Sequence, residues 1–217
     1  MQNSLNNPAK YPSHIVIADD HDMHRDIVKI ILESRYPDTR ISEASDYESL
    51  NRVCTSLNPE FVLLDVCMPG MNGLSGVYNI IKAHPKTRFL ICSAIDSPIL
   101  VRTMLAFGAA GYVYKSMTAN ELLASIDIVL QGGVCAPPEI ADDPNGTSLT
   151  RRQWEVLGLM CNGKSNKEIA NSLNISVDTI KYHISELLKT LHAQSRVHAI
   201  SICNLTSPSP HDADAAK

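Results

Sequence analysis

The stretch Phe61-Val62-Leu63-Leu64-Asp65-Val66-Cys67-Met68-Pro69-Gly70 decides the fold of this chain. Four apolar residues predict a short buried strand, and the chain turns directly after Asp65. Three other apolar runs also end in polar groups: Ile15–Ala18 before Asp19 and Asp20, Phe89–Cys92 before Ser93, and Gly111–Tyr114 before Lys115. The carboxyl ends of parallel strands share one edge of a sheet, where ligands bind. We therefore expect a crevice with three carboxylates, a hydroxyl and an ammonium group, suited to a divalent cation and a phosphoryl group.

The first 131 residues alternate short strand-like runs with amphipathic segments. The expected strands are 14–18, 39–44, 61–64, 88–92 and 111–113, and the expected helices are 23–35, 46–57, 74–84, 98–107 and 118–131. Five strand–helix repeats predict a parallel sheet covered by helices on both faces. The predicted fold class is α/β flavodoxin-like, with strand order 2-1-3-4-5.

A second, all-α part follows. Residues 132–147 are rich in glycine and proline and are interpreted as a linker. Helices are expected at 151–161, 166–173, 177–191 and 196–203, and three residues join the middle pair as in a helix-turn-helix. The sequence thus predicts a first domain over 13–131 and a second over 148–205, with disordered ends at 1–12 and 206–217.

Composition narrows the class of protein. The six cysteines show no metal-binding spacing, and we expect them to be reduced and mostly buried, as in a cytoplasmic protein. No secretory signal is expected in the first dozen polar residues, and no apolar run is long enough to cross a membrane. Residues 148–205 carry seven basic and four acidic residues, although the chain has a net charge of −4. A mildly basic second domain favours a polyanionic partner.

The predicted crevice suits Mg²⁺, which prefers oxygen ligands and keeps several waters. Asp20 and Asp65 are the expected direct ligands, with Asp19 acting through water and the backbone carbonyl of Cys67 as a further ligand. A nucleophilic carboxylate can accept a phosphoryl group. Lys115 and Ser93 would then hold phosphate oxygens. Each residue alone is also explained as turn chemistry or ordinary surface, so the prediction depends on their joint occurrence.

Four motifs mark the first domain: Ile-Ala-Asp19-Asp20-His, Leu-Leu-Asp65-Val-Cys-Met-Pro-Gly-Met-Asn-Gly73, Cys-Ser93-Ala94 and Gly111-Tyr-Val-Tyr-Lys115. With these motifs, residues 14–131 resemble a response-regulator receiver domain. The resemblance implies that Asp65 is phosphorylated by a histidine kinase in the presence of Mg²⁺. It also implies a switch in which Ser93 moves toward the phosphate and Tyr112 swings inward.

The motifs of the second domain include Leu149-Thr150, Glu155-Val-Leu157, Ser165-Asn-Lys-Glu-Ile-Ala170 and Thr179-Ile-Lys181. With these motifs, residues 149–203 resemble a LuxR-type DNA-binding domain, which together with the receiver indicates the NarL-like class of response regulator. In a helix-turn-helix the second helix enters the major groove of double-stranded DNA. Lys181, Tyr182 and Ser185 are the candidates for base contacts. The expected phosphate contacts are Asn166, Lys167, Thr179, His183 and Lys189.

The spacing of apolar residues in the second helix separates a buried face from an exposed one. Val177, Ile180, Ile184, Leu187 and Leu191 form the expected buried stripe. Lys181 and Lys189 could equally be solvated surface residues, and His183 could be a packed histidine. Trp154, the only tryptophan, stands where the family usually has a polar residue. It would pack against the first domain or another subunit, or remain half exposed.

The leading hypothesis is a cytoplasmic transcription regulator, rather than an enzyme, that forms a homodimer when phosphorylated and acts with RNA polymerase. In the unphosphorylated form the receiver is expected to cover or restrain the recognition helix. Cys67 and Ile95 are unsuited to positioning a hydrolytic water, which predicts slow self-dephosphorylation. One alternative is a regulator that ignores phosphorylation and uses the receiver as a dimerisation scaffold. Another is an Mg²⁺-dependent phosphatase, which would need a carboxylate at the position of Cys67.

Overall fold

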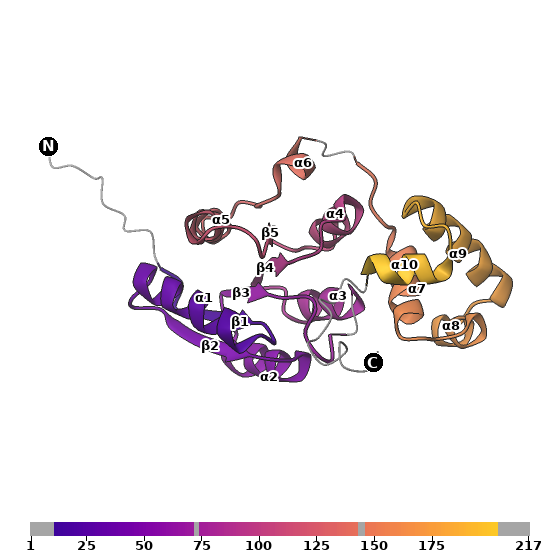
Figure 1. Cartoon of the computed structure of the whole chain (residues 1–217). Helices are drawn as coiled ribbons and strands as arrows, with labels where there is room; N and C mark the ends of the chain where they lie inside the picture. Colours follow the sequence, from indigo (N-terminus) through magenta and orange to yellow (C-terminus); the bar gives the residue numbers. More distant parts are fainter. Residues whose placement is uncertain (1–10, 72–73, 143–145, 204–217) are drawn as a thin grey trace, which may run out of the picture.

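The computed structural model describes residues 11–71, 74–142 and 146–203 of the 217-residue chain. Its first part contains β1 (His14–Ala18), α1 (Asp22–Arg35), β2 (Arg40–Ala44), α2 (Tyr47–Leu57), β3 (Phe61–Leu64), α3 (Leu74–Ala83), β4 (Arg88–Ser93), α4 (Pro98–Ala106), β5 (Gly111–Tyr114) and α5 (Ala119–Leu130). The five strands form one parallel sheet in the order β2-β1-β3-β4-β5 (Figure 1). The predicted fold class and strand order are confirmed.

The sheet is buried on both faces because alternate side chains of each strand enter different cores. Val16, Val62 and Ile91 point into the core that contains α2, α3 and α4. Ile15 and Leu63, one residue away in their strands, point into the core that contains α1 and α5. The arrangement fixes the register of the sheet, since a slip of one residue would exchange the two cores.

Side-chain caps explain where several helices begin. Capping boxes start α5 at Thr118 and start two helices of the second part at Thr150 and Ser165. A further box at the start of α2 pairs Asp46 with Ser49. In each box a side chain accepts a hydrogen bond from a backbone N–H of the first turn, which would otherwise have no partner within the helix.

The segment interpreted as a linker contains structure that its composition does not predict. Cys135 forms a parallel bridge with Gly111, and its carbonyl accepts a hydrogen bond from the Tyr112 N–H at 2.8 Å. A side chain on Gly111 would lie 2.8 Å from that carbonyl, so the close approach needs glycine. A short helix, α6 (Pro138–Ala141), follows and buries Ile140 against α4.

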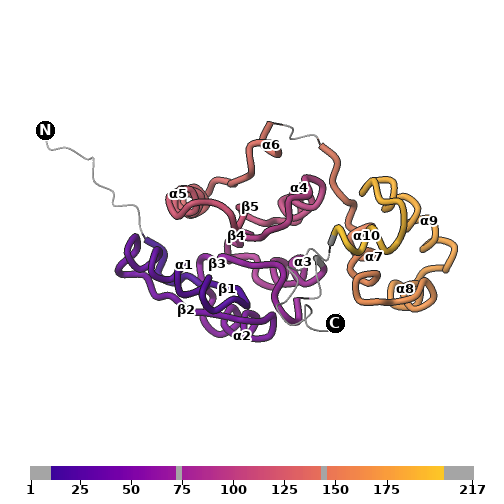
Figure 2. Tube along the Cα trace, in the orientation of Figure 1, coloured from indigo at the N-terminus to yellow at the C-terminus, as the bar shows by residue number. Residues whose placement is uncertain are grey.

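The second part consists of α7 (Arg151–Cys161), α8 (Asn166–Leu173), α9 (Val177–Thr190) and α10 (Arg196–Cys203). These helices agree with the sequence prediction to within one residue. The tube in Figure 2 shows this orange-to-yellow unit beside α3 and α4. One continuous hydrophobic cluster contains the α2–α3–α4 core of the first part together with buried side chains of the second part, so the two parts are packed together.

The contact between the two parts is centred on Trp154 of α7, which is 1% exposed. Its ring meets Phe107, at the end of α4, edge-on at 5.2 Å between centroids, and Phe107 meets Tyr78 of α3 at 5.3 Å. Beside these rings, α7 approaches α3 so closely that a Cβ on Gly158 would lie 2.8 Å from the Cβ of Ser75. Packing of Trp154 against the first domain, one of three expected outcomes, is confirmed.

Residues 1–10 and 204–217, which cover most of the predicted disordered ends, lie outside the described residues. Tyr11, within the predicted disordered N-terminus, packs edge-on against Tyr36, and the carbonyl of Pro12 accepts a hydrogen bond from Thr39 at 2.8 Å. Among the described helices none has both the length and the apolar character of a membrane span.

Candidate functional site: an acidic pocket and a DNA-reading helix

Asp65 lies at the carboxyl end of β3, in the middle of the sheet edge, and is 2% exposed. Its Oδ1 accepts a hydrogen bond from the Cys67 N–H at 3.1 Å, and its Oδ2 lies 2.8 Å from the Lys115 ammonium. Burial raises the pKa of Asp65 above its usual value, while Lys115 and the Cys67 N–H oppose the rise. The carboxylate is thus held in place by a turn and by a cation from β5.

Asp19 and Asp20 follow β1 and lie next to Asp65, as the sequence predicts. Burial alone would raise the pKa of Asp19, but hydrogen bonds from His24, Lys115 and the His21 backbone outweigh it and hold this pKa well below its usual range. Burial likewise opposes the charge of Lys115, but its bonds to Asp19 and Asp65 raise its pKa. Lys115 lies 2.8 Å from both carboxylates, so it neutralises part of their mutual repulsion.

Ser93 ends β4 beside Asp65 and is fully buried. Its hydroxyl accepts a hydrogen bond from the Ile95 N–H at 3.3 Å and interacts with the Cys67 thiol and the Tyr112 hydroxyl. Tyr112 is also fully buried, and its hydroxyl donates to the Ile95 carbonyl at 2.5 Å. The two residues expected to form the switch are therefore linked through the loop that leads from β4 into α4.

The donor chemistry of the pocket fits a hard divalent cation such as Mg²⁺. Asp19, Asp20 and Asp65 each offer a carboxylate oxygen, and these oxygens lie within 4.8 Å of one another. Asp20 Oδ1 is buried and has no hydrogen-bond partner among the described residues. A buried carboxylate oxygen without a donor is costly unless a cation satisfies it. The role of the Cys67 carbonyl as a ligand stays a prediction.

Two histidines at this pocket were not singled out from the sequence. His21 caps the start of α1, and its Nδ1 lies 3.1 Å from Asp19 Oδ1 and 2.7 Å from Asp20 Oδ1. His24, one turn later, places Nδ1 2.7 Å from Asp19 Oδ2. Their spacing of three residues places both on one face of the helix start. The pattern His-x-x-His directly after Asp19-Asp20 was the signal that could have found them.

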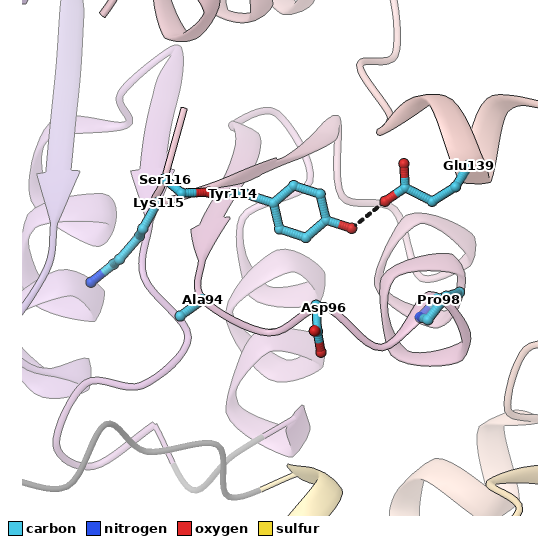
Figure 3. Close-up of a pocket in the computed structure, with 7 residues that line it drawn as sticks. All are labelled: Ala94, Asp96, Pro98, Tyr114, Lys115, Ser116 and Glu139. Carbon is cyan, nitrogen blue, oxygen red and sulfur yellow. Dashed lines mark hydrogen bonds between the residues drawn. The ribbon is translucent and has the colours of Figure 1, made fainter. Parts of the chain in front are cut away.

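A pocket next to this site connects β5 to the linker. It is lined by Ala94, Asp96, Pro98, Tyr114, Lys115, Ser116 and Glu139 (Figure 3). The Tyr114 hydroxyl donates to Glu139 Oε1 at 2.5 Å, while Lys115 points to the other side, away from this pair. The Tyr114 ring also meets the Tyr112 ring edge-on at 5.5 Å. The linker helix α6 is therefore tied to β5, which contains Tyr112 and is followed directly by Lys115.

Most of the predicted DNA contacts project from the second part into solvent. The exposed ones are Lys167, Thr179, Lys181, Tyr182, Ser185 and Lys189. Asn166 and His183 are half-buried, and Asn166 Oδ1 accepts a hydrogen bond from Arg196 at 3.2 Å. In the predicted buried stripe, Ile180, Leu187 and Leu191 are buried and Ile184 is half-buried. Val177 is 37% exposed, so its predicted burial is wrong: it lies in the first turn, at the edge of the α8–α9 contact.

The first domain does not cover the reading face of α9 in this arrangement. Lys181, Tyr182 and Ser185 are exposed, and Tyr182 is 63% exposed. The contact with the first domain is centred on α7, which packs on α3 and against Phe107 at the end of α4. The expectation that the receiver covers the recognition helix is therefore wrong for these three side chains, and the alternative expectation, that the receiver restrains this helix, stays a prediction.

Comparisons with known proteins agree with this architecture. Residues 15–127 match the family described as the response regulator receiver domain, and residues 147–203 match the LuxR family of bacterial regulatory proteins. The glycerol metabolism activator of Pseudomonas putida is 32% identical over 204 residues, which cover 86% of this chain and 92% of the relative. The nitrate/nitrite response regulator protein NarL of Escherichia coli K12 is 32% identical over 201 residues, covering 87% and 93%.

A solved structure shows the same fold. RcsB from Salmonella enterica serovar Typhimurium, bound to a promoter in the presence of the phosphomimetic BeF₃⁻, superposes with a TM-score of 0.67 at 20% identity and covers 88% of this chain and 98% of RcsB. The sheet order, the acidic pocket and both family matches lead to one conclusion. The chain belongs to the response regulators that join a receiver domain to a LuxR-type helix-turn-helix DNA-binding domain.

Proposed function

We propose that Asp65 accepts a phosphoryl group from a histidine kinase and that this event controls transcription through the helix-turn-helix. The observation that carries the proposal is the Asp65 carboxylate, buried at the sheet edge between Lys115 and two further carboxylates. In the transfer an Asp65 oxygen forms a bond to phosphorus while the bond from phosphorus to the kinase imidazole nitrogen breaks. The nitrogen keeps the electron pair, and Lys115 holds a phosphate oxygen.

Mg²⁺ bound by Asp19, Asp20 and Asp65 would neutralise charge on the phosphoryl oxygens. Residues of the chain itself would hold the acceptor carboxylate and the transferred phosphoryl group. Lys115 already bridges Asp19 and Asp65 and can follow the phosphate, and the Cys67 N–H fixes the acceptor. Ser93 would move toward a phosphate oxygen, and Tyr112, which is already turned inward, would hold that position.

The route from Asp65 to DNA would run through α4. Ser93 and Ile95 precede this helix, and Phe107 at its end packs against Trp154 of the DNA-binding domain. The Thr103 hydroxyl of α4 accepts a hydrogen bond from the Leu149 N–H at 2.9 Å, just before α7. A shift of α4 would therefore change the docking of α7. The buried Trp154 Nε1 has no hydrogen-bond partner among the described residues, which costs about 1–3 kcal/mol and favours release.

On release we propose that the protein dimerises and reads two half-sites of double-stranded DNA, where it would act with RNA polymerase. Tyr182, Lys181 and Ser185 would contact base edges, and the outer residues of α9 and α8 would contact phosphates. Dimers on DNA are described for RcsB, whose fold this chain shares.

The test is to treat the full-length protein with a small phosphodonor and Mg²⁺. We expect mass gain on the Asp65 peptide, a dimer in solution and stronger retention of promoter DNA. Asp65→Asn should abolish all three effects, whereas Asp22→Asn, at an exposed neighbouring position, should leave them intact. Phosphorylation at another residue, or none, would refute the proposal.

A second candidate is a regulator that ignores phosphorylation and uses its receiver as a dimerisation scaffold. The exposure of Lys181, Tyr182 and Ser185 while the two domains are packed together favours it, because the reading face is accessible in this arrangement. Promoter output distinguishes the two functions. Output that is unchanged by Asp65→Asn supports the scaffold and excludes phosphorylation control.

A further inference from the structure

Tyr114 joins the last strand of the sheet to the linker helix α6. Its hydroxyl donates to Glu139 Oε1 at 2.5 Å, at one side of the pocket in Figure 3. This hydrogen bond lowers the pKa of Glu139, so the acceptor is an ionised carboxylate at neutral pH. Hydrogen bonds from a hydroxyl to a carboxylate are short, about 2.5–2.7 Å, and stronger than those between neutral groups.

The Tyr114 ring rests on the ring that is expected to form the switch. Tyr112 and Tyr114 are two residues apart in β5 and therefore face the same side of the sheet. Their rings meet edge-on at 5.5 Å between centroids, and Tyr112 is fully buried, with its hydroxyl on the Ile95 carbonyl. From this support the Tyr114 hydroxyl extends to α6 (Figure 3).

The helix α6 depends on the receiver for its place. It has only four residues, Pro138–Ala141, and a helix of this length is not stable in isolation. Ile140 is 5% exposed and packs against α4. Among the described residues, the Tyr114–Glu139 pair is the one side-chain hydrogen bond that α6 makes. Two contacts, one apolar and one polar, therefore hold the linker helix on the receiver.

A second carboxylate lines the same pocket. Asp96 lies in the loop between β4 and α4, is exposed, and makes no hydrogen bond or ion pair with the described residues. Burial and the bond to Glu139 raise the pKa of Tyr114, and the charge of Asp96 adds to the rise. In Figure 3 the Asp96 carboxylate points away from the Tyr114–Glu139 pair. A hydroxyl has one proton to donate, so Tyr114 can serve only one of the two carboxylates at a time.

We propose that the Tyr114 hydroxyl is a latch with two acceptors: bonded to Glu139 it holds α6 on the receiver, and bonded to Asp96 it releases α6. Asp96 follows Ser93 by three residues, so a shift of Ser93 toward a phosphate would move Asp96 as well. This exchange of acceptors rests on the proposed phosphorylation of Asp65. The bond to Glu139 acts in the unphosphorylated protein, and it acts on the connecting chain rather than on α4.

Release of α6 lengthens the chain that tethers the DNA-binding domain. With α6 held, the nine residues 142–150 connect it to α7. With α6 released and Cys135 still bridged to Gly111, the tether is the fifteen residues 136–150. The effective concentration of a tethered domain falls roughly as the −3/2 power of tether length, so docking of α7 on the receiver should weaken about twofold.

The experiment measures hydrogen–deuterium exchange of the α6 amides in the full-length protein. The N–H groups of Ile140, Ala141 and Asp142 donate within α6, so they exchange when this helix opens. Tyr114→Phe removes the hydroxyl and keeps the ring, and Glu139→Ala removes the acceptor. Each should raise the exchange rate about 2- to 12-fold, the net worth of one hydrogen bond. The double variant should exchange no faster than the faster single variant, because both changes break the same bond.

Phosphorylation supplies the second half of the test. A small phosphodonor with Mg²⁺ should raise exchange of the wild-type α6 amides to the level of Tyr114→Phe. Asp96→Ala should exchange as wild type before this treatment and should lose the increase after it, although Asp65 still gains mass. Tyr11→Phe, which removes a tyrosine hydroxyl from an exposed position of the receiver, is the matched control and should behave as wild type throughout.

Three outcomes decide between the parts of the proposal. Wild-type exchange in Tyr114→Phe, or additive effects in the double variant, overturns the latch. An increase on phosphorylation that persists in Asp96→Ala overturns the exchange of acceptors. The proposed function is judged separately by mass gain at Asp65: if none occurs, phosphorylation control and the exchange of acceptors both fail, and the unphosphorylated variants alone decide the bond to Glu139.

Discussion

Replacing Gly158 by alanine tests whether the docking of α7 on α3 controls the DNA-binding domain. The added Cβ would lie 2.8 Å from Ser75 Cβ and 3.0 Å from its Oγ. Carbon atoms in contact prefer about 3.5–4.0 Å, so α7 must withdraw by roughly 1 Å, which forfeits about a quarter to a half of the dispersion energy of each affected contact. Overpacking of this kind costs about 1–3 kcal/mol, equivalent to roughly a 5- to 150-fold change in the docking equilibrium.

The effect on docking can be separated from an effect on the helix itself. Alanine within a helix is more favourable than glycine by about 0.5–1 kcal/mol, in the docked and the undocked state alike. The DNA-binding domain should therefore gain thermal stability while its contact with the receiver weakens. A variant that folds poorly would instead lose thermal stability in the DNA-binding domain as well as the contact with the receiver.

Trp154 reports the outcome directly because it is the only tryptophan and is buried in this contact. We expect Gly158→Ala to shift its fluorescence to the red, to enlarge the particle in small-angle X-ray scattering, and to raise DNA affinity without phosphorylation. Ser75→Gly in the same chain removes the opposing Cβ and should restore the wild-type spectrum. A wild-type spectrum and scattering curve in Gly158→Ala alone would refute the reasoning.

Three further predictions concern Cys67 and the reading helix. The phosphoryl group on Asp65 should hydrolyse slowly, because neither Cys67 nor the buried Ile95 can orient a water molecule. In an assay on purified protein, Cys67→Asn should release phosphate at least about tenfold faster than wild type, and equal rates in the two proteins would contradict this prediction. Burial raises the pKa of Cys67 from 9.0 to about 11, so the thiol stays protonated at neutral pH. Site-resolved alkylation of Cys67 at pH 8 should therefore run roughly 100-fold slower than that of an ordinary thiol, and its rate should rise with pH up to about 11. In DNA-binding titrations, Tyr182→Ala should cost about 1–3 kcal/mol of binding free energy on the operator sequence only. Lys189→Ala should weaken binding to all DNA sequences and reduce the slope of log affinity against log salt concentration by about one. The reverse pattern would exchange the roles of the two residues.

Secondary structure and the acidic pocket were predictable because they depend on local patterns and on strand topology. The apolar run Phe61–Leu64 indicates a buried strand from its local pattern alone. The parallel topology of the sheet then brings Asp19, Asp65 and Lys115 together. The same topology argument places Ser93 at this edge. None of these steps requires knowledge of which side chains touch across the molecule.

Features that arise from tertiary packing were not predictable in the same way. The helix α6 lies in a segment whose prolines indicate a linker, and burial of Ile140 against α4 stabilises it. Asn166 was expected to contact phosphate, but its side chain is engaged by Arg196, thirty residues later. The contact of His24 with Asp19 depends on how α1 is placed next to the end of β1, although the His-x-x-His spacing is visible in the sequence.

The aromatic contact of α7 also limits how this regulator can be recombined with others. An engineered chimaera that joins its C-terminal domain to a foreign receiver would carry a large indole whose partner, Phe107, stays behind. The transplanted surface would then be open to water and prone to self-association. Compatibility between modules in this protein is therefore decided by a few ring contacts at the domain boundary as well as by the length of the connecting chain.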